Sequence, residues 1–256
     1  LVTFDGRVEN GRGFEAANAS ADLAATIRDF NFKGYTYRNA VIDGRLEEKF
    51  FNGSFQIVDS NIDFNFTGEV DFRDSIPTFD FDAAIAELDL EALNLTKKPL
   101  SLAGAVDLNL QGTNFSEMEG QVFLEDFTVY LDTVAVDIDS LLAYSAFNPS
   151  GEKVVKLESD IAAGEIIGTF DLDEVSTSLT GYIVRYYPQW AQRLNIRKPR
   201  REPAPNRFSF DLLVKDSRGL NRLLTPKLGR LRDLSLSGGY DGYEDTTRIQ
   251  LISPEI

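Results

Sequence analysis

The sequence predicts a mostly β protein, built as a meander of antiparallel strands. The first observation is a two-residue period: in NIDFNFTGEVDF (61–72) the apolar residues fall on even positions and the polar residues on odd positions. The second is that similar stretches recur up to residue 172, each bounded by Gly, Asn, Asp or Pro, which favour turns. The third is a composition of 43% hydrophobic and 26% charged residues, which is typical of a folded domain.

The predicted strands follow one another closely along residues 1–172. Many short strands of this kind are typical of a sandwich, a barrel or a long solenoid-like sheet. Their spacing is irregular, so the pattern indicates successive antiparallel strands and not a strict repeat. The strand signals lie in the ranges 2–10, 53–59, 61–72, 77–95, 102–112, 118–132, 133–140 and 165–173.

Two later stretches depart from the two-residue period. DEVSTSLTGYIVRYY (173–187) has apolar residues at spacings of three and four, which predicts an amphipathic helix near 173–190, capped by Asp173 and ended or kinked by Pro188. RKPRREPAPNR (197–207) is basic and rich in proline, which is typical of an extended loop. Strand signals then resume, with a short helix expected near 216–228.

These signals divide the chain into three segments. Residues 1–172 are expected to form an elongated antiparallel sheet, and residues 173–207 a helix followed by the basic loop. Residues 208–256 are expected to add terminal strands to the same sheet, which would make one continuous domain.

The composition excludes several kinds of site. The chain has no Cys and no His, so it holds no Cys nucleophile, no Ser-His-Asp triad and no Cys/His zinc site. Residues 1–180 carry 12 Lys and Arg against 33 Asp and Glu, which argues against nucleic acid as a partner. The Asp-x-Asp pairs 80/82, 137/139 and 171/173 suit the wet side of alternating strands better than a Ca²⁺ site or the carboxylate pair of a hydrolase. We therefore expect no enzyme activity, no metal and no cofactor.

The apolar side of the strands is the main candidate for function. It is either the dry core of a sandwich or a surface that stays open to bind an apolar ligand. The candidate residues for such a surface are Phe55, Ile57, Ile62, Phe64, Phe66, Val70, Phe72, Val106, Leu108 and Leu110. The basic loop offers a second candidate, a contact for an anionic partner, through Arg197, Lys198, Arg200 and Arg201.

Three stretches resemble the TamB branch of the AsmA-like envelope proteins of Gram-negative bacteria. They are FKGYTYRNAVIDGRLEEKFFNGSFQIVDSNIDFNFTGEVDF (32–72), LSLAGAVDLNLQGTNFSEMEGQVFLEDFTVYL (100–131) and KLESDIAAGEIIGTFDLDEVSTSLTGYIVRYYP (156–188). The stretch 100–131 follows the family's loose order of apolar strand, Gly, short polar stretch, Glu-Gly and apolar strand. The resemblance implies a curved, taco-shaped β-sheet (a β-taco) with an elongated open hydrophobic groove.

The resemblance also implies a function and a location. Such proteins are inner-membrane anchored, reach through the periplasm and are implicated in moving phospholipids towards the outer membrane. We therefore expect a non-enzymatic segment of a periplasmic bridge that conducts phospholipid acyl chains, with this chain as an internal or C-terminal-side piece. The family also implies a role in outer-membrane protein assembly, with an outer-membrane barrel protein as a partner through parts not present here. The alternative is a structural or adhesive envelope β-sandwich with a dry core.

Overall fold

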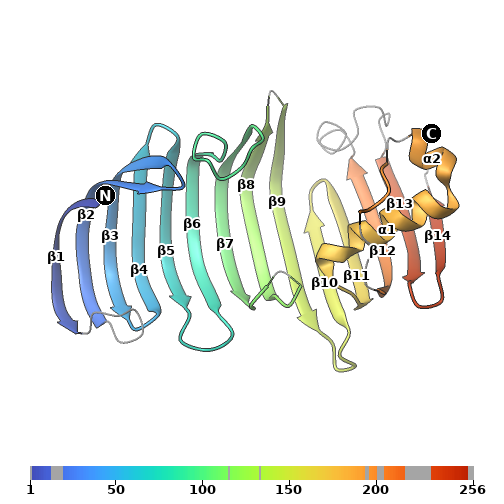
Figure 1. Cartoon of the computed structure of the whole chain (residues 1–256), viewed down its shortest axis with the longest axis horizontal. Coiled ribbons are helices and arrows are strands. Elements are labelled where there is room, and N and C mark those ends of the chain that lie inside the picture. The colour runs from blue at the N-terminus through green and yellow to red at the C-terminus, as the bar shows by residue number, and fades with distance from the viewer. Residues whose placement is uncertain are drawn as a thin grey trace.

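The computed structural model describes residues 2–12, 20–114, 116–132, 134–193, 196–200, 205–216 and 232–252. In these ranges the chain forms fourteen strands and two helices (Figure 1). The strands are β1 (Val2–Arg12), β2 (Ser20–Phe32), β3 (Tyr35–Glu47), β4 (Phe50–Asp59), β5 (Ile62–Asp71), β6 (Thr78–Asp89), β7 (Leu100–Gln111), β8 (Glu119–Leu131), β9 (Val134–Phe147), β10 (Lys153–Ser159), β11 (Ala162–Thr169), β12 (Arg207–Asp216), β13 (Arg232–Asp241) and β14 (Thr246–Ile252). The helices are α1 (Leu172–Tyr186) and α2 (Pro188–Arg193).

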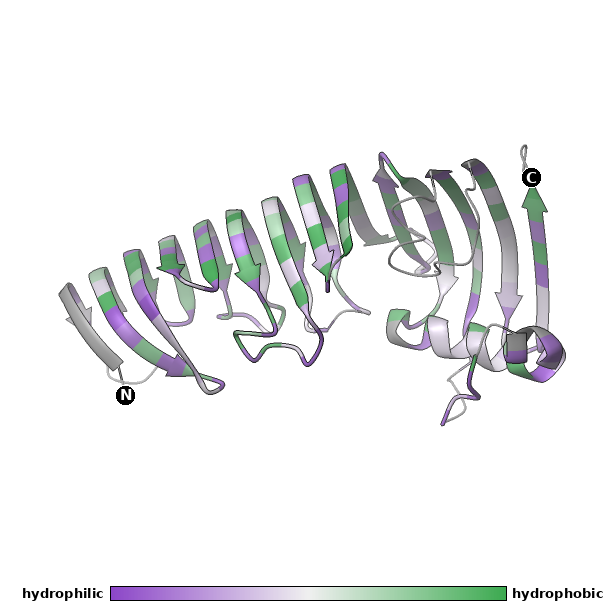
Figure 2. Ribbon diagram, turned by 90° about the horizontal axis from the view of Figure 1, so that it is seen from above, coloured by the Kyte–Doolittle hydropathy of each residue, from purple (hydrophilic) through white to green (hydrophobic). Residues whose placement is uncertain are grey.

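All described strands belong to one sheet. Each strand pairs with the next in antiparallel fashion, so the order in space from β1 to β14 is the order in the chain. The sheet is curved and open, and its two edges are β1 and β14 (Figures 1 and 2). This confirms the predicted curved antiparallel meander, and β12 to β14 continue the same sheet after the two helices. No second sheet exists among the described residues to form the other layer of a sandwich.

Strand register explains why one side of the sheet is apolar. Phe66 of β5 lies opposite Phe55 of β4 and Ala83 of β6, and Phe64 lies opposite Ile57. Directly opposed residues point to the same side of a sheet, so the two-residue periods of successive strands add up to one surface. We call this side, which carries Phe64 and Phe66, the apolar face.

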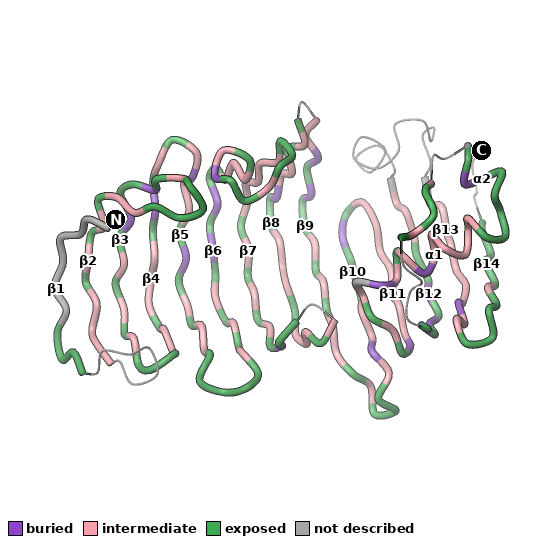
Figure 3. The backbone as a smooth tube through the Cα atoms, viewed as in Figure 1, coloured by how far each residue is buried: buried purple, intermediate pink, exposed green. Residues whose placement is uncertain are grey.

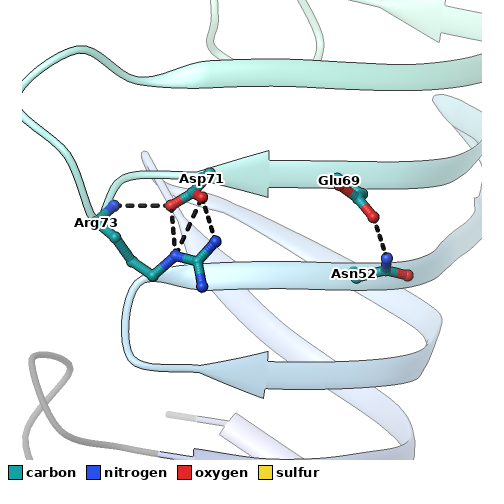
Figure 4. Close-up of polar contacts among 4 residues, drawn as sticks. All are labelled: Asn52, Glu69, Asp71 and Arg73. Carbon is teal, nitrogen blue, oxygen red and sulfur yellow. Dashed lines mark hydrogen bonds and ion pairs between the residues drawn. The ribbon is translucent and has the colours of Figure 1, made fainter.

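The other side, which we call the polar face, is held by hydrogen bonds and ion pairs between neighbouring residues. Figure 4 shows Asn52 of β4 donating a hydrogen bond to Glu69 of β5. At the end of β5, Arg73 forms a forked ion pair with Asp71 through Nε at 3.0 Å and Nη2 at 2.5 Å. Exposed pairs of this kind contribute little to stability.

The first helix begins one residue earlier than expected. The backbone N–H groups of Glu174 and Val175 donate to the carbonyl of Asp171 at 3.0 and 3.1 Å, so Asp171 precedes the helix and the predicted cap at Asp173 is wrong. The reason lies in Phe170, whose ring packs edge-to-face on Phe208 at 5.7 Å. That contact holds the chain at the sheet, and the helix starts directly after it.

The predicted helix over 173–190 is in fact two helices. α1 ends at Tyr186, as Pro188 predicts, and Pro188 becomes the first residue of α2, a position where its missing N–H costs nothing. The short helix expected near 216–228 lies outside the described residues, apart from Asp216, which ends β12.

α1 packs against the apolar face near the C-terminal end of the sheet. Its residues Val175, Leu179 and Tyr182 contact a buried cluster on β12 and β13 that consists of Phe208, Phe210 and Tyr240. In Figure 2 the helix lies on one side of the sheet only. α1 therefore covers part of the apolar face of β12 and β13. Leu212, Ile249 and Leu251 on the same face stay exposed, and the strands before β11 do not have this cover.

Candidate functional site: the apolar face

One end of the apolar face is covered by the connection between β6 and β7, residues 90–99. Leu93 in this connection has no exposed surface. It packs in a buried cluster with Tyr37 and Ala40 of β3, Ile57 of β4 and Ile62 of β5. Under this connection, at one end of the strands, the apolar side chains therefore form an ordinary dry core.

The opposite end of the strands is covered by the connection between β7 and β8, which is described at residues 112–114 and 116–118. The carbonyl oxygen of Met118 accepts hydrogen bonds from Lys153 Nζ at 3.0 Å and from Ser145 Oγ at 2.8 Å. Ser116 Oγ donates to the Asp171 carboxylate at 2.5 Å, just before α1. This connection therefore reaches from β8 to the start of α1, along one edge of the face.

Lys153 is a buried cation on the apolar face. It opposes Phe147 of β9 and Gly168 of β11, only 2% of its surface is exposed, and its Nζ lies 4.9 Å from the centre of the Phe147 ring. Desolvation lowers the pKa of Lys153 below its ordinary value, although Glu119 and Glu117 act in the opposite direction. The Met118 carbonyl and the Phe147 ring stabilise the charge that remains.

Aromatic rings fill the face between β3 and β6. Gly44, Gly53 and Gly68 lie opposite one another on three neighbouring strands, which leaves a line without side chains. The ring of Phe66, on one side of this line, lies 6.2 Å from that of Phe51 on the other side. It lies 4.8 Å from the ring of Phe81, which opposes Gly68 and continues the line on β6. Packing of this kind compensates for glycine in a strand and explains why Phe66 is buried.

The centre of the face, from β6 to β10, has a covered part and an open part. Near the β6–β7 connection, Ile85, Phe127, Val136 and Ile138 form a second buried cluster. Farther along the strands the face is left open. One row across these strands consists of opposed residues: Phe81, Leu108, Val122, Ala143 and Leu157. All of them are half-buried except Leu157, which is 37% exposed. Figure 3 shows the corresponding half-buried stretches along β7 and β8. We call this row and its apolar neighbours the central section.

The structure places the predicted residues in different parts of the apolar face. Ile57, Ile62 and Phe66 are buried, and the rings of Phe55 and Phe64 pack against the cluster around Leu93. Phe72 follows the end of β5, is 46% exposed and packs edge-to-face on Phe79 at 5.6 Å. The half-buried residues outside the Leu93 cluster are Val70, Val106, Leu108 and Leu110.

Several residues of the central section were missed. They are Phe79, Phe81, Val122, Leu124, Leu141, Ala143 and Leu157, which oppose predicted positions or continue their rows. Their two-residue period is the same signal, so the sequence alone contains it.

The acidic pairs lie on the wet side. Asp80, Asp82, Asp137 and Asp139 are exposed. Among the described residues no group of three His, Cys, Asp or Glu side chains is arranged to hold a metal ion. None of the described helices combines the length and the apolar character that crossing a membrane requires.

Cavities also lie on the polar face, where one reaches Leu157, and beside α1. One, of about 600 Å³, lies on the polar face and is lined by Leu142 and Tyr144 of β9 and Leu213 of β12. The other, of about 590 Å³, lies beside α1 and is lined in part by Lys198 and Arg200 of the basic loop. Arg197 is exposed, and Arg201 lies outside the described residues.

Comparison of the chain with protein-family models, with curated proteins and with solved structures finds no match. The described residues form one open β-sheet. Connections at the strand ends and α1 cover parts of its apolar face, and part of the centre is left open.

Proposed function

We propose that the apolar face binds the acyl chains of phospholipids, and that the chain is a non-enzymatic segment of a bridge that conducts these lipids between the inner and outer membranes through the periplasm. The observation that carries the proposal is the open central section. Residues 90–99, residues 112–114 with 116–118, and α1 each cover part of the face, and the row from Phe81 to Leu157 has none of these covers. Large exposed apolar surfaces of soluble domains usually mark binding sites.

The chemistry of the central section fits an acyl chain. Its exposed atoms are hydrocarbon from Phe, Leu, Val and Ala, and each CH₂ group removed from water contributes about 0.8 kcal/mol. Such contacts are non-directional, so a chain can move along the row without breaking specific bonds. The polar face carries the ion pairs and most of the charged side chains, although Leu142 and Tyr144 of β9 are also exposed there.

The wider setting is part of the same proposal. The resemblance of three stretches to TamB supports a place in the periplasm, an anchor in the inner membrane and a contribution to outer-membrane protein assembly. A covering segment that completes a dry core is the alternative, and the next experiment distinguishes the two.

The test is the binding of a fluorescent fatty acid to single variants of β7. Leu108 and Asn109 are neighbours on the strand, but Leu108 opposes Phe81 and Asn109 opposes Asp80, so they point to opposite faces. Leu108→Asp is expected to lower the affinity at least about tenfold, because it places a carboxylate against the acyl chain. Asn109→Asp adds the same charge on the polar face and is expected to bind normally.

Circular dichroism separates loss of binding from loss of fold. A Leu108→Asp protein that folds and binds as well as the wild type contradicts the proposal. A Leu108→Asp protein that unfolds while Asn109→Asp stays folded supports the dry-core alternative. Phe64→Asp is less informative, because Phe64 packs against two buried clusters and is needed for folding in either case.

A further inference from the structure

A cavity of about 590 Å³ lies between α1, the basic loop and the end of β13. Its size is within the range of small-molecule sites. Its walls carry Arg185 and Tyr182 from α1, Lys198 and Arg200 from the loop, and Tyr240 and Asp245 from β13 and the turn that follows it. Segments that are far apart in the sequence therefore meet around one space.

The cavity is cationic in a strongly acidic chain. Three basic side chains and one carboxylate line it, whereas the whole chain has a formal net charge of −15. The carboxylate is already engaged: Arg185 Nη1 lies 2.9 Å from Asp245 Oδ2, and the Tyr186 hydroxyl donates to the same oxygen. Lys198 and Arg200 are exposed on the other wall and leave an excess of positive charge there.

The base of the cavity is built from buried hydroxyl groups. Ser178 has 1% of its surface exposed and accepts a hydrogen bond from Asn206 Nδ2 at 2.8 Å. Tyr240 is buried as well, and burial raises the pKa of its hydroxyl. The gap between the helix and the loop depends on Gly181, where an added Cβ would stand 3.8 Å from Pro199 Cγ. A larger residue at Gly181 would occupy this space.

The cavity lies on the same side of the sheet as the central section. Tyr240 opposes Phe208, and Phe208 opposes Gly168, which in turn opposes Lys153 on the apolar face. Tyr240 also belongs to the buried cluster under α1. Beside that cluster, Ile249 and Leu251 of β14 oppose Gly238 and Leu236 on the same face, and both are exposed. A ligand with one anionic end and one apolar end matches this arrangement.

We infer that this cavity binds the phosphate group of a lipid headgroup while the acyl chains lie on the apolar face. Guanidinium and ammonium groups are the side chains that recognise phosphate oxygens, and the guanidinium fork of Arg200 suits two of these oxygens at once. The inference rests on the proposed function for the lipid itself. The cavity adds a selection for lipids that carry phosphate.

The test compares two short-chain lipids that differ only in phosphate. Dihexanoyl phosphatidic acid and dihexanoylglycerol are titrated as monomers into the wild type, into Lys198→Gln/Arg200→Gln and into the control Lys97→Gln/Lys98→Gln. The control removes the same charge from two exposed lysines of the β6–β7 connection. Glycerol 3-phosphate and inorganic phosphate are titrated as probes without acyl chains.

The wild type and the control are expected to bind phosphatidic acid at least about tenfold more tightly than dihexanoylglycerol, and Lys198→Gln/Arg200→Gln is expected to lose that preference.

Equal binding of both lipids by the wild type, or a preference that survives in Lys198→Gln/Arg200→Gln, overturns the inference and leaves acyl-chain binding intact. Phosphatidic acid that binds no more tightly than glycerol 3-phosphate or inorganic phosphate shows a site for free phosphate compounds and overturns the lipid assignment. Failure of both lipids to bind overturns the proposed function itself.

Discussion

Lys153 Nζ donates a hydrogen bond to the carbonyl oxygen of Met118 at 3.0 Å and so ties β10 to the connection between β7 and β8. In a meander, strands contact mainly their sequence neighbours, and contacts of this kind are the few that reach across several strands. Together with the hydrogen bond from Ser116 to Asp171, this contact holds the β7–β8 connection in place over the ends of the strands. How much of the face stays open therefore depends on its connections.

The burial of Lys153 predicts a pH dependence of stability. Because desolvation lowers its pKa in the fold, the folded state releases the proton at a lower pH than the unfolded state does. Between the lowered pKa and the ordinary value of about 10.5, the unfolded state binds more protons, so the free energy of unfolding rises with pH. Urea denaturation of the wild type and Lys153→Met across this range should show the rise in the wild type relative to the variant.

Lys156 gives the matched control on the same strand. It lies on the polar face beside Glu165, at 2.6 Å, and the hydrogen bond to that carboxylate raises its pKa. The stabilisation from Lys156 is therefore lost as the pH rises through the raised pKa. The free energy of unfolding of the wild type should fall with pH relative to that of Lys156→Met, which is opposite to the effect of Lys153. Parallel behaviour of the two variants would refute the account of Lys153.

Leu93 is expected to be the most important residue of its connection for stability. Leu93→Ala leaves a cavity against Ile57 and Ile62 and should lower the free energy of unfolding by about 2–5 kcal/mol. Leu95→Ala, two residues away at a position that is 38% exposed, should cost less than about 1 kcal/mol. Equal losses in chemical denaturation would show that the connection does not form part of the core.

The close approach of β6 at Gly68 predicts that a side chain at this position would destabilise the fold. A Cβ added at Gly68 would stand 2.3 Å from the Asp80 carbonyl oxygen, and the φ angle of Gly68 is +149°. Gly68→Ala should therefore lower the free energy of unfolding by about 1–3 kcal/mol. Gly181→Ala, in α1 with free space around it, should leave stability unchanged or raise it by up to about 1 kcal/mol. Thermal denaturation of both variants checks this contrast.

Asn206 forms hydrogen bonds that connect α1 to the sheet. Its Oδ1 accepts the N–H of Asp171 at 3.0 Å, its Nδ2 donates to Ser178, and its own surface is 2% exposed. Asn206→Ala leaves buried polar groups unsatisfied, which costs about 1–3 kcal/mol. Hydrogen exchange should therefore speed up in α1, with no change in β3 to β6. Uniform acceleration in all strands would mean that Asn206 supports the whole sheet and not the helix.

The strands and the meander were predictable from the sequence, because the two-residue period depends only on whether each residue is polar or apolar. The shift of apolar positions from Ile85 to Leu88 was also visible in the sequence, and it corresponds to an irregularity in the pairing of β6 with β7. The start of α1 was missed because the decisive contact, Phe170 on Phe208, joins residues 38 positions apart.

The extent of the open surface was not predictable in the same way. Ile57 and Leu108 have the same pattern in the sequence, yet Ile57 is buried under Leu93 and Leu108 is not. The difference comes from the path of residues 90–99. The sequence predicts a strand that continues to residue 95, but β6 ends at Asp89 and the connection places Leu93 against Ile57. The cationic cavity likewise depends on Arg185 and Asp245 meeting across 60 positions, for which no local pattern gives a signal.

The most direct test of the central claim is photocrosslinking from Leu108 and Asn109, each replaced in turn by a photoreactive amino acid in cells that produce the protein. Acyl-chain binding predicts phospholipid adducts from position 108 and none from position 109, since the two side chains point to opposite faces. Adducts at both positions at equal yield, or adducts with protein alone at position 108, would contradict the claim that the centre of the apolar face is open to lipid.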